Sequence, residues 1–391
     1  MPANNKQKLG DLFRNRRERG LPGLPVVSVT LNDGLVGRDT LDRKTDTNLA
    51  PEEHLLIKAG DIAYNMMRMW QGASGLAQHD GIVSPAYVVL APKNGIDPVF
   101  ASYWFKSPRI IYLFWAYSYG LTNDRLRLYF KDFAEIPVSV HPQDEQISIG
   151  KILTLWDTAI VQTGKLIEAK RKLKKGLMQQ LLTGKRRFPG FTGKLQRYEF
   201  SQIAKLSQAR HDPKTSKQDF RCVELEHIAQ GDGHLLGTTS SKKQSSVKAL
   251  FDKRDILFGK LRPNLRKYFF CSFDGVCSTE IWVLKANRNI CTDDYLYQLV
   301  QTDRFISTAC ATTGSKMPRA DWEWVAEQMY DLPPIPEQEK ITSVLSVVDR
   351  EIEALKHLSN QLNEQKRGLM QKLLTGQTRV KATGEITALG P

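Results

Sequence analysis

The sequence predicts an α+β protein in which two mixed α/β domains are joined by two long antiparallel coiled-coil helices, forming a pseudo-twofold internal repeat. Residues 176–184 read GLMQQLLTG, and residues 368–376 read GLMQKLLTG, a match at all but one position. The match continues upstream, where Asp61-Ile62 corresponds to Asp255-Ile256. A repeat of about 190 residues is far longer than the roughly 20 to 50 residues of a solenoid unit. Each copy is therefore a globular domain plus a helix, and the many side-chain differences indicate two binding surfaces of one kind.

The order of the segments follows from local chemistry. Short β-rich runs separated by turn residues such as Asn32-Asp33-Gly34 predict the mixed domains. Proline followed by acidic residues, as at Pro142 and Pro336, favours the first turn of a helix, and Gly184 and Gly376 stand where a helix ends. The predicted segments are a first domain (1–140), a central helix (141–185), a second domain (186–335), a C-terminal helix (336–376) and a tail (377–391).

Apolar residues in both helices recur at alternating steps of three and four, which is the spacing of a coiled-coil seam. A helix of about 40 residues is roughly 60 Å long, so an antiparallel pair would act as a spacer between the domains. The alternative is that each helix packs only on its own domain. The residues expected to pair are Ile152, Trp156, Leu166 and Leu177 in the first helix and Leu345, Val348, Ile352, Leu355 and Leu369 in the second.

The net charge of +14 predicts a polyanionic partner, because lysine and arginine that bind phosphates release condensed counterions. Solubility or an acidic protein partner would explain the same charge. No apolar run approaches the roughly 18 residues needed to cross a bilayer, so we expect no membrane association.

All five cysteines lie in the second copy, and none has a counterpart in the first. A disulfide or zinc site important to the repeated unit would occur in both copies, and the chain has no CxxC pair. We therefore expect free thiols and a reducing, cytoplasmic location.

Motifs of catalysis are incomplete. Gly231-Asp232-Gly233 lacks the third glycine of a dinucleotide fingerprint, and no GxxxxGK[ST] loop is present. The run Leu332-Pro333-Pro334-Ile335 lacks both the polar acceptor and the aromatic ring with which amino-methyltransferases hold a flipped base. The sequence thus predicts no catalytic residue, no metal ligand and no cofactor.

Taken in order, the parts of this chain resemble the specificity subunit of a type I restriction-modification system. The matching parts are a variable domain, a Pro-x-x-x-Gln start at Pro142 to Gln146, a long helix ending in LMQQLLTG, and then the same parts again. The resemblance implies two target-recognition domains that each read half of a bipartite double-stranded DNA site, and helices that fix the spacing. It further implies two methyltransferase subunits as partners, with ATP-dependent restriction subunits for cleavage, so that the chemistry belongs to the partners.

Basic residues in turn-rich segments are the candidate DNA contacts. Arginine can bond guanine and asparagine can bond adenine through two hydrogen bonds, while lysine and arginine commonly bind phosphates. Solvated surface charge is the alternative for every one of them. The candidates are Arg68, Asn123, Arg125 and Arg127 in the first copy and Lys260, Arg262, Arg266, Lys316 and Arg319 in the second.

Two other functions remain open. A coiled-coil scaffold without sequence-specific DNA binding would lack salt-dependent affinity for DNA. A nuclease with an unrecognised site would have to cut DNA in magnesium as the pure chain.

Overall fold

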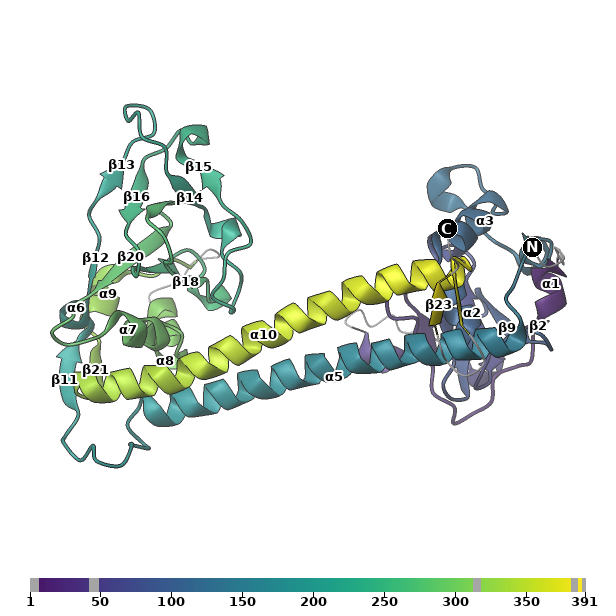
Figure 1. Ribbon diagram of the computed structural model, residues 1–391, viewed down its shortest axis with the longest axis horizontal. Helices are drawn as coiled ribbons and strands as arrows, with labels where there is room; N and C mark the ends of the chain where they lie inside the picture. The colour runs from purple at the N-terminus through teal and green to yellow at the C-terminus, as the bar shows by residue number, and fades with distance from the viewer. Residues whose placement is uncertain (1–6, 42–48, 312–317, 381–385, 389–391) are drawn as a thin grey trace. The chain divides into compact units, whose positions relative to one another are not determined.

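The computed structural model describes residues 7–41, 49–311, 318–380 and 386–388 (Figure 1). The chain divides into two compact units, of which unit 1 combines Met1–Gly164 with His357–Pro391 and unit 2 is Lys165–Lys356. The long helices are α5 (Gln143–Leu181) and α10 (Ile335–Leu374). Each unit therefore holds one globular domain, the first part of the helix that follows it and the last part of the other helix.

The globular domain of unit 1 is built on a four-stranded antiparallel sheet in the order β2-β9-β6-β7, with the pairs β1-β10, β3-β4 and β5-β8 beside it. A further pair, β22-β23, follows α10. The strands are β1 (Gln7–Lys8), β2 (Phe13–Arg16), β3 (Val27–Val29), β4 (Leu35–Gly37), β5 (Leu55–Ile57), β6 (Ile62–Asn65), β7 (Ser74–Leu76), β8 (Gly81–Val83), β9 (Tyr87–Pro92), β10 (Pro137–Val138), β22 (Thr378–Val380) and β23 (Ile386–Ala388), and the helices are α1 (Leu9–Leu12), α2 (Pro98–Trp104), α3 (Pro108–Ala116) and α4 (Phe130–Ala134).

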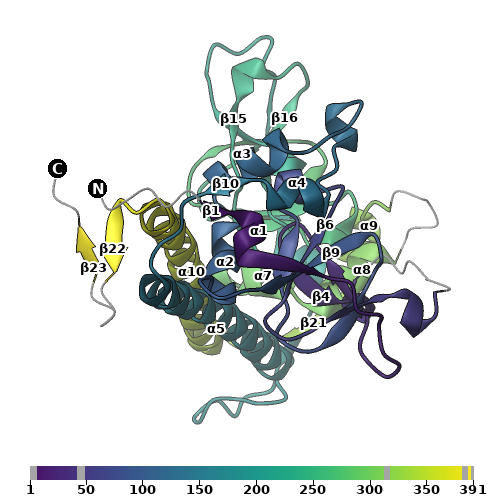
Figure 2. The same cartoon turned by 90° about the vertical axis from the view of Figure 1, so that its right-hand side faces the viewer.

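Aromatic rings fill the core of unit 1. Phe13, Phe105 and Phe133 are fully buried, and their ring centroids lie 5.5 to 6.1 Å apart. The same core takes in Leu153 from α5 and Leu373 from α10. Figure 2 faces this unit and shows the two helices side by side. Burial of both leucines explains why the helices join the domain instead of standing free.

Unit 2 contains a sheet of the same order, β12-β20-β17-β18, and a five-stranded sheet, β13-β16-β19-β14-β15. The pair β11-β21 corresponds to β1-β10. The strands are β11 (Gln196–Glu199), β12 (Ala204–Leu206), β13 (Arg210–His211), β14 (Arg221–Val223), β15 (Thr239–Ser240), β16 (Lys248–Phe251), β17 (Ile256–Gly259), β18 (Tyr268–Phe270), β19 (Gly275–Cys277), β20 (Ile281–Ala286) and β21 (Met329–Leu332), and the helices are α6 (Phe200–Ile203), α7 (Asp293–Val300), α8 (Asp303–Cys310) and α9 (Trp322–Ala326).

The predicted repeat holds at the level of strand register. Ile62 pairs with Leu90 in unit 1, and Ile256 pairs with Leu284 in unit 2. These are the positions that match in the sequence. The predicted fold class, two mixed domains joined by two long helices, is confirmed.

A buried glutamine fixes the start of each long helix. Gln146 accepts a hydrogen bond from the Asp97 amide at 2.9 Å and donates to the Gly95 and His141 carbonyls at 2.9 and 2.8 Å. Gln338 makes the equivalent set in unit 2. Both side chains are fully buried, so the glutamine of the Pro-x-x-x-Gln start satisfies backbone groups that water cannot reach.

Reciprocal ion pairs join the end of each long helix to the start of the other. In unit 2, Arg187, just after the end of α5, binds Glu337 at the start of α10 at 2.7 Å. In unit 1, Arg379, just after α10, binds Glu145 at the start of α5 at 2.8 Å. Both glutamates are buried. The end of one helix and the start of the other are thus held together in each unit.

The same reciprocity occurs within the helices, where Asp157 of α5 pairs with Lys366 of α10 at 2.5 Å in unit 1. In unit 2, Asp349 of α10 pairs with Lys174 of α5 at 2.8 Å. Asp157 and Asp349 are 192 residues apart, as are Lys174 and Lys366, so the two ion pairs are equivalent under the repeat. A residue near the start of each helix pairs with one near the end of the other, which shows that the helices run antiparallel.

None of the five cysteines, all of which the structure describes, forms a disulfide; four are buried and Cys310 is partly buried. Burial raises the pKa of Cys222 to about 12, with the nearby Glu224 carboxylate adding to the effect, so this thiol stays protonated and unreactive near neutral pH. Among the described residues, no helix combines the length and hydrophobicity that crossing a membrane requires.

Candidate nucleic-acid interface

In unit 1, the structure brings together two basic segments that are separate in sequence. One is the β6–β7 loop with Arg68, and the other is the α3–α4 connection with Arg125 and Arg127. The Leu128 amide donates to the Met66 carbonyl at 3.0 Å. The two segments therefore form one surface.

Unit 2 repeats this junction between the β17–β18 loop and the α8–α9 connection. The Arg262 amide donates to the Pro318 carbonyl at 2.7 Å, and the Ala320 amide donates to the Lys260 carbonyl at 2.8 Å. Lys316 lies outside the described residues. We call each junction the paired loops of its unit.

Two arginines in the paired loops of unit 1 are available to a ligand. Arg125 and Arg127 are exposed, and within the described part of the chain their side chains make no ion pair or hydrogen bond. Arg68 donates to the Gln71 side chain at 3.1 Å. Asn123 begins a 3-10 turn that ends at Arg125, and its side chain lies outside the described part.

The four predicted candidate cations that the structure describes in the paired loops of unit 2 divide into two that are available and two that are engaged. Exposed Arg262 and partly exposed Lys260 have no side-chain partner among the described residues. Arg319, in contrast, pairs with Glu280 at 3.0 Å, and Arg266 pairs with Asp303. A phosphate would have to displace these carboxylates, so Arg262 and Lys260 are the stronger candidates.

Backbone strain accompanies the available cation in unit 2. Arg262 and Arg266 have φ angles of 52° and 51°, in the left-handed region that residues other than glycine rarely adopt. They flank the short turn Pro263–Leu265, which the Leu265 and Arg266 amides close with 2.9 Å hydrogen bonds. Such strain persists only where surrounding structure imposes it, and it collects at functional sites.

Exposed aromatic side chains that were not among the predicted site residues lie next to the paired loops of unit 1. Tyr112 and Trp115 on α3 are 62% and 45% exposed, and their ring centroids lie 5.7 Å apart. Tyr119 in the following connection is 63% exposed. The helical spacing gave a signal, because Tyr112 and Trp115 fall on the face opposite the buried Ile110 and Phe114.

Comparison with known proteins shows which proteins this chain resembles. The family model described as "Type I restriction modification DNA specificity domain" matches residues 201–364. The MjaVIII specificity subunit of Methanocaldococcus jannaschii is 22% identical over 365 residues, covering 84% of this chain and 81% of that protein. The chain is therefore similar to the specificity subunits of type I restriction-modification systems.

Other type I specificity subunits match over shorter stretches. The EcoDI subunit of Escherichia coli is 26% identical over 48% of this chain, and the match spans 41% of the EcoDI protein. The HindI subunit of Haemophilus influenzae is 26% identical over 30% of this chain, and that match spans about a quarter (26%) of the HindI protein.

Solved structures support the type I specificity-subunit fold. The S subunit of a type I system from M. genitalium has a TM-score of 0.56 at 16% identity, covering 95% of this chain and 97% of its own. A chain from a structure on assembly and conformational transition of a type I R-M system has a TM-score of 0.54 at 13% identity, covering 96% and 98%. The likeness therefore extends to both copies of the repeat, although the family model matches mainly the second.

The two long helices bury much of the predicted seam. Leu345, Val348 and Ile352 are buried, whereas Leu166 is 46% exposed and contributes less packing than predicted. The other predicted seam residues are partly buried, namely Ile152, Trp156, Leu177, Leu355 and Leu369.

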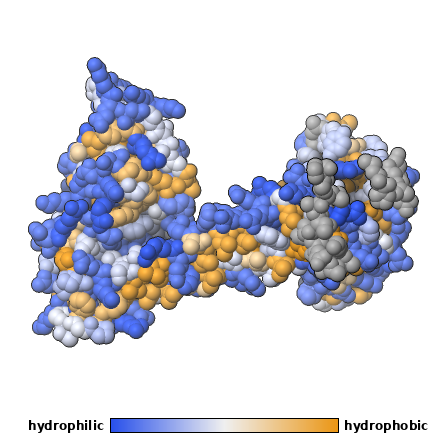
Figure 3. All heavy atoms as spheres, viewed as in Figure 1, coloured by the Kyte–Doolittle hydropathy of each residue, from blue (hydrophilic) through white to orange (hydrophobic). Residues whose placement is uncertain are grey.

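The helices also keep apolar surface exposed, which Figure 3 shows as hydrophobic patches along them. Leu155 and Leu358 are 69% and 43% exposed in unit 1, and Val347 and Leu166 are each 46% exposed in unit 2. Leu155 matches Val347, and Leu166 matches Leu358, at the repeat distance of 192. Each unit therefore exposes the same two apolar positions, one on each helix.

Proposed function

We propose that this chain is the DNA-specificity subunit of a type I restriction-modification complex and has no active site of its own. It reads a bipartite site with a fixed unread spacer and directs methylation and restriction by its partner subunits. The observation that carries this proposal is the pair of equivalent loop junctions on one skeleton with different available cations. Unit 1 presents Arg125 and Arg127, and unit 2 presents Lys260 and Arg262. A shared skeleton with different side chains suits two readers of different half-sites.

DNA is the favoured ligand of the paired loops because of their chemistry. Guanidinium groups bond guanine through O6 and N7 in the major groove, and unpaired lysines bind phosphates. Because Arg266 and Arg319 are already engaged by carboxylates, they suit a positioning role better than a base-reading role. Lys316, Asn123 and Arg68 remain candidate contacts.

The two helices are the proposed ruler. They contain 39 and 40 residues, which at 1.5 Å per residue is about 60 Å of helix. Two readers on one face of a duplex must stand about one helical turn apart or a multiple of it. The reciprocal ion pairs keep the helices in one register, so the spacer length is fixed.

The partners are methyltransferase and restriction subunits. The repeat-related exposed apolar residues are Leu155 and Leu358 in unit 1 and Val347 and Leu166 in unit 2. Equivalent exposed positions suit two copies of the same partner, and we assign them to two methyltransferase subunits. ATP-dependent restriction subunits join for cleavage. A complex of this kind works on DNA in the cytoplasm.

Co-expression with the methyltransferase subunit, followed by mapping of methylated bases in host DNA, tests the function. We expect one bipartite motif with a constant gap. Replacing residues 1–140 by another recognition domain should change one half of the motif and leave the other half intact. A stable complex that methylates no bipartite motif would refute the proposal, as would a swap that leaves both halves unchanged.

A further inference from the structure

The turn Gly231-Asp232-Gly233 contacts several charged side chains of unit 2 through Asp232. Its hairpin is closed by the Ala229 amide, which donates to the His234 carbonyl at 3.0 Å. Gly233 has φ 72°, and a Cβ added there would lie 2.2 Å from the Tyr297 hydroxyl. Only glycine fits this position, so the tip of the turn, Asp232, is held in one place.

Asp232 receives one cation from each long helix. Lys356 of α10 binds its Oδ1 atom directly, and Arg171 of α5 lies 3.5 Å from the same oxygen. The Asp232 and Lys356 side chains are only 21% and 19% exposed. His234 Nδ1 lies 2.9 Å from Oδ2. Partial burial works to raise the pKa of Asp232, but the hydrogen bond from Lys356 and the nearby positive charges keep it below its ordinary value. One carboxylate thus ties the recognition domain to both helices within unit 2.

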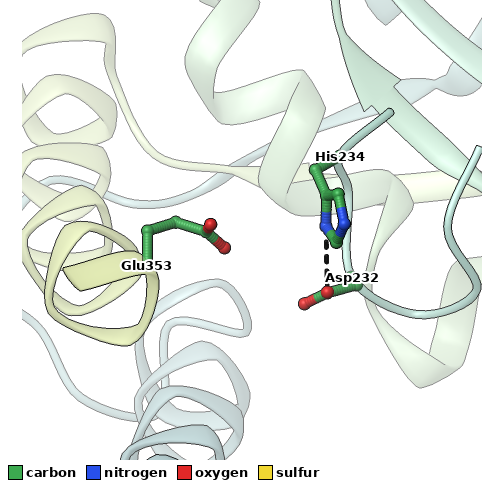
Figure 4. Close-up of side chains that lie close together, drawn as sticks. All are labelled: Asp232, His234 and Glu353. Atoms are coloured by element: carbon green, nitrogen blue, oxygen red, sulfur yellow. Dashed lines mark ion pairs between the residues drawn. The ribbon is translucent and has the colours of Figure 1, made fainter. Parts of the chain in front are cut away.

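A metal ion is a poor fit to this cluster. Figure 4 shows Asp232 and His234 on the turn and Glu353 on α10, three groups whose ligand atoms lie within 4.8 Å of one another. However, the Lys356 ammonium binds both Asp232 and Glu353, the latter at 2.7 Å. A divalent cation at these oxygens would be repelled by that ammonium. Lys356 itself supplies the positive charge.

Side chains do not fill the space between the turn and the long helices, so the ion pairs of Asp232 are the main contacts between them. The turn, both helices and α8 border a cavity of about 630 Å³ with Tyr268 and Tyr297 in its wall. Where apolar side chains do not fill the space between two elements, dispersion and burial contribute little to holding them together. The contacts of Asp232 therefore carry the attachment of this turn to the helices.

Unit 1 cannot form an equivalent contact, as the sequence alone shows. At the repeat distance of 192, Arg171 matches Asn363, Glu353 matches Val161, and Lys356 matches Gly164. The contact is an addition to the second copy, beyond the pairs that both copies share.

We propose that Asp232 is a positioning residue that locks the second recognition domain to the helices and thereby sets the selectivity for spacer length. The proposal rests on the function inferred above. One extra base pair moves the second half-site by about 3.4 Å and turns it by about 34°. A domain free to tilt at this turn would follow that displacement, whereas a locked domain would not.

The test uses the complex of this chain with its methyltransferase subunit and DNA substrates with the native spacer or one base pair more or less. For Asp232→Asn and Lys356→Met, the preference for the native spacer should fall about twofold to fivefold, as expected from losing partly exposed ion pairs. Asp232→Glu, which keeps the charge, should retain the preference. Glu226→Gln is the matched control, because its side chain is 83% exposed and its carboxylate lies 3.9 Å from the His227 ring.

A second measurement separates this proposal from the function on which it rests. Hydrogen exchange of the free chain should show faster exchange at Ala229, Gly231 and Leu236 in Asp232→Asn, whether or not DNA is read. Wild-type complex that methylates no bipartite site would count against the function alone. Unchanged hydrogen exchange in Asp232→Asn, or an equal loss of methylation at all spacer lengths, would overturn the role of Asp232. A rise in melting temperature that zinc induces in wild type and that Asp232→Asn abolishes would overturn it too.

Discussion

Replacing Gln338 by leucine should destabilise unit 2 by breaking the hydrogen bonds that position the start of α10. The Gln338 side chain is fully buried, accepts from the Thr292 amide at 3.0 Å, and donates to the Ile290 and Pro333 carbonyls at 2.7 and 2.9 Å. Leucine has a similar size but satisfies none of these groups. Each buried group left unpaired costs about 1 to 3 kcal/mol, so the loss of all three partners should cost at least about 3 kcal/mol.

The assay is thermal and denaturant unfolding, with hydrogen exchange to locate the change. For a unit of this size, the loss corresponds to a fall of about 10 °C in the melting temperature. Gln146→Leu should cost a similar amount but act on unit 1, because its hydrogen bonds are equivalent. Gln361→Leu, on the exposed face of α10, should change stability by no more than about 0.5 kcal/mol. A Gln338→Leu protein as stable as wild type would refute the reasoning.

Three other sites give predictions of binding, stability and pH dependence. The double variant Lys260→Ala, Arg262→Ala should weaken DNA binding and lower the slope of log affinity against log salt by about one for each phosphate that loses its cation, measured by salt titration; an unchanged slope would exclude phosphate binding by this pair. Glu337→Gln should cost about 1 to 3 kcal/mol in unfolding experiments, because it removes the charge-assisted hydrogen bonds between Arg187 and the buried Glu337 carboxylate. A melting curve like that of wild type would contradict this. Burial lowers the pKa of His141 below its ordinary value of 6.5. The unfolded chain therefore binds the extra proton at a higher pH than the folded chain, and unit 1 should lose stability as pH falls below about 6.5. His141→Asn should flatten this dependence of stability on pH, and equal pH profiles for the two proteins would exclude His141 as its cause.

Much of the architecture was predictable because it rests on local and repeated patterns. Heptad spacing predicted the long helices, now seen as α5 and α10. Matches such as Asp61-Ile62 with Asp255-Ile256 predicted two copies of one domain, and strand register confirms them. A periodic pattern can be read from sequence because helical and strand geometry fix which side chains share a face.

The candidate interface was only partly predictable. The basic residues were named from composition and turn chemistry, but the sequence does not say that the β6–β7 loop and the α3–α4 connection meet. Nor does it distinguish the unpaired Arg262 from Arg319, which binds Glu280. Availability of a charge depends on which carboxylates the fold brings near it, and those lie far away in the chain.

The sequence by itself determined the duplication and the two long helices, because repeated motifs and the spacing of apolar residues can be read directly from it. Only the tertiary structure decided how the two helices are joined within each unit. Arg187 binds Glu337 and Arg379 binds Glu145 because the end of each helix folds beside the start of the other. Partners separated by 150 and 234 residues leave no local pattern, since their energy arises only when distant segments are buried together.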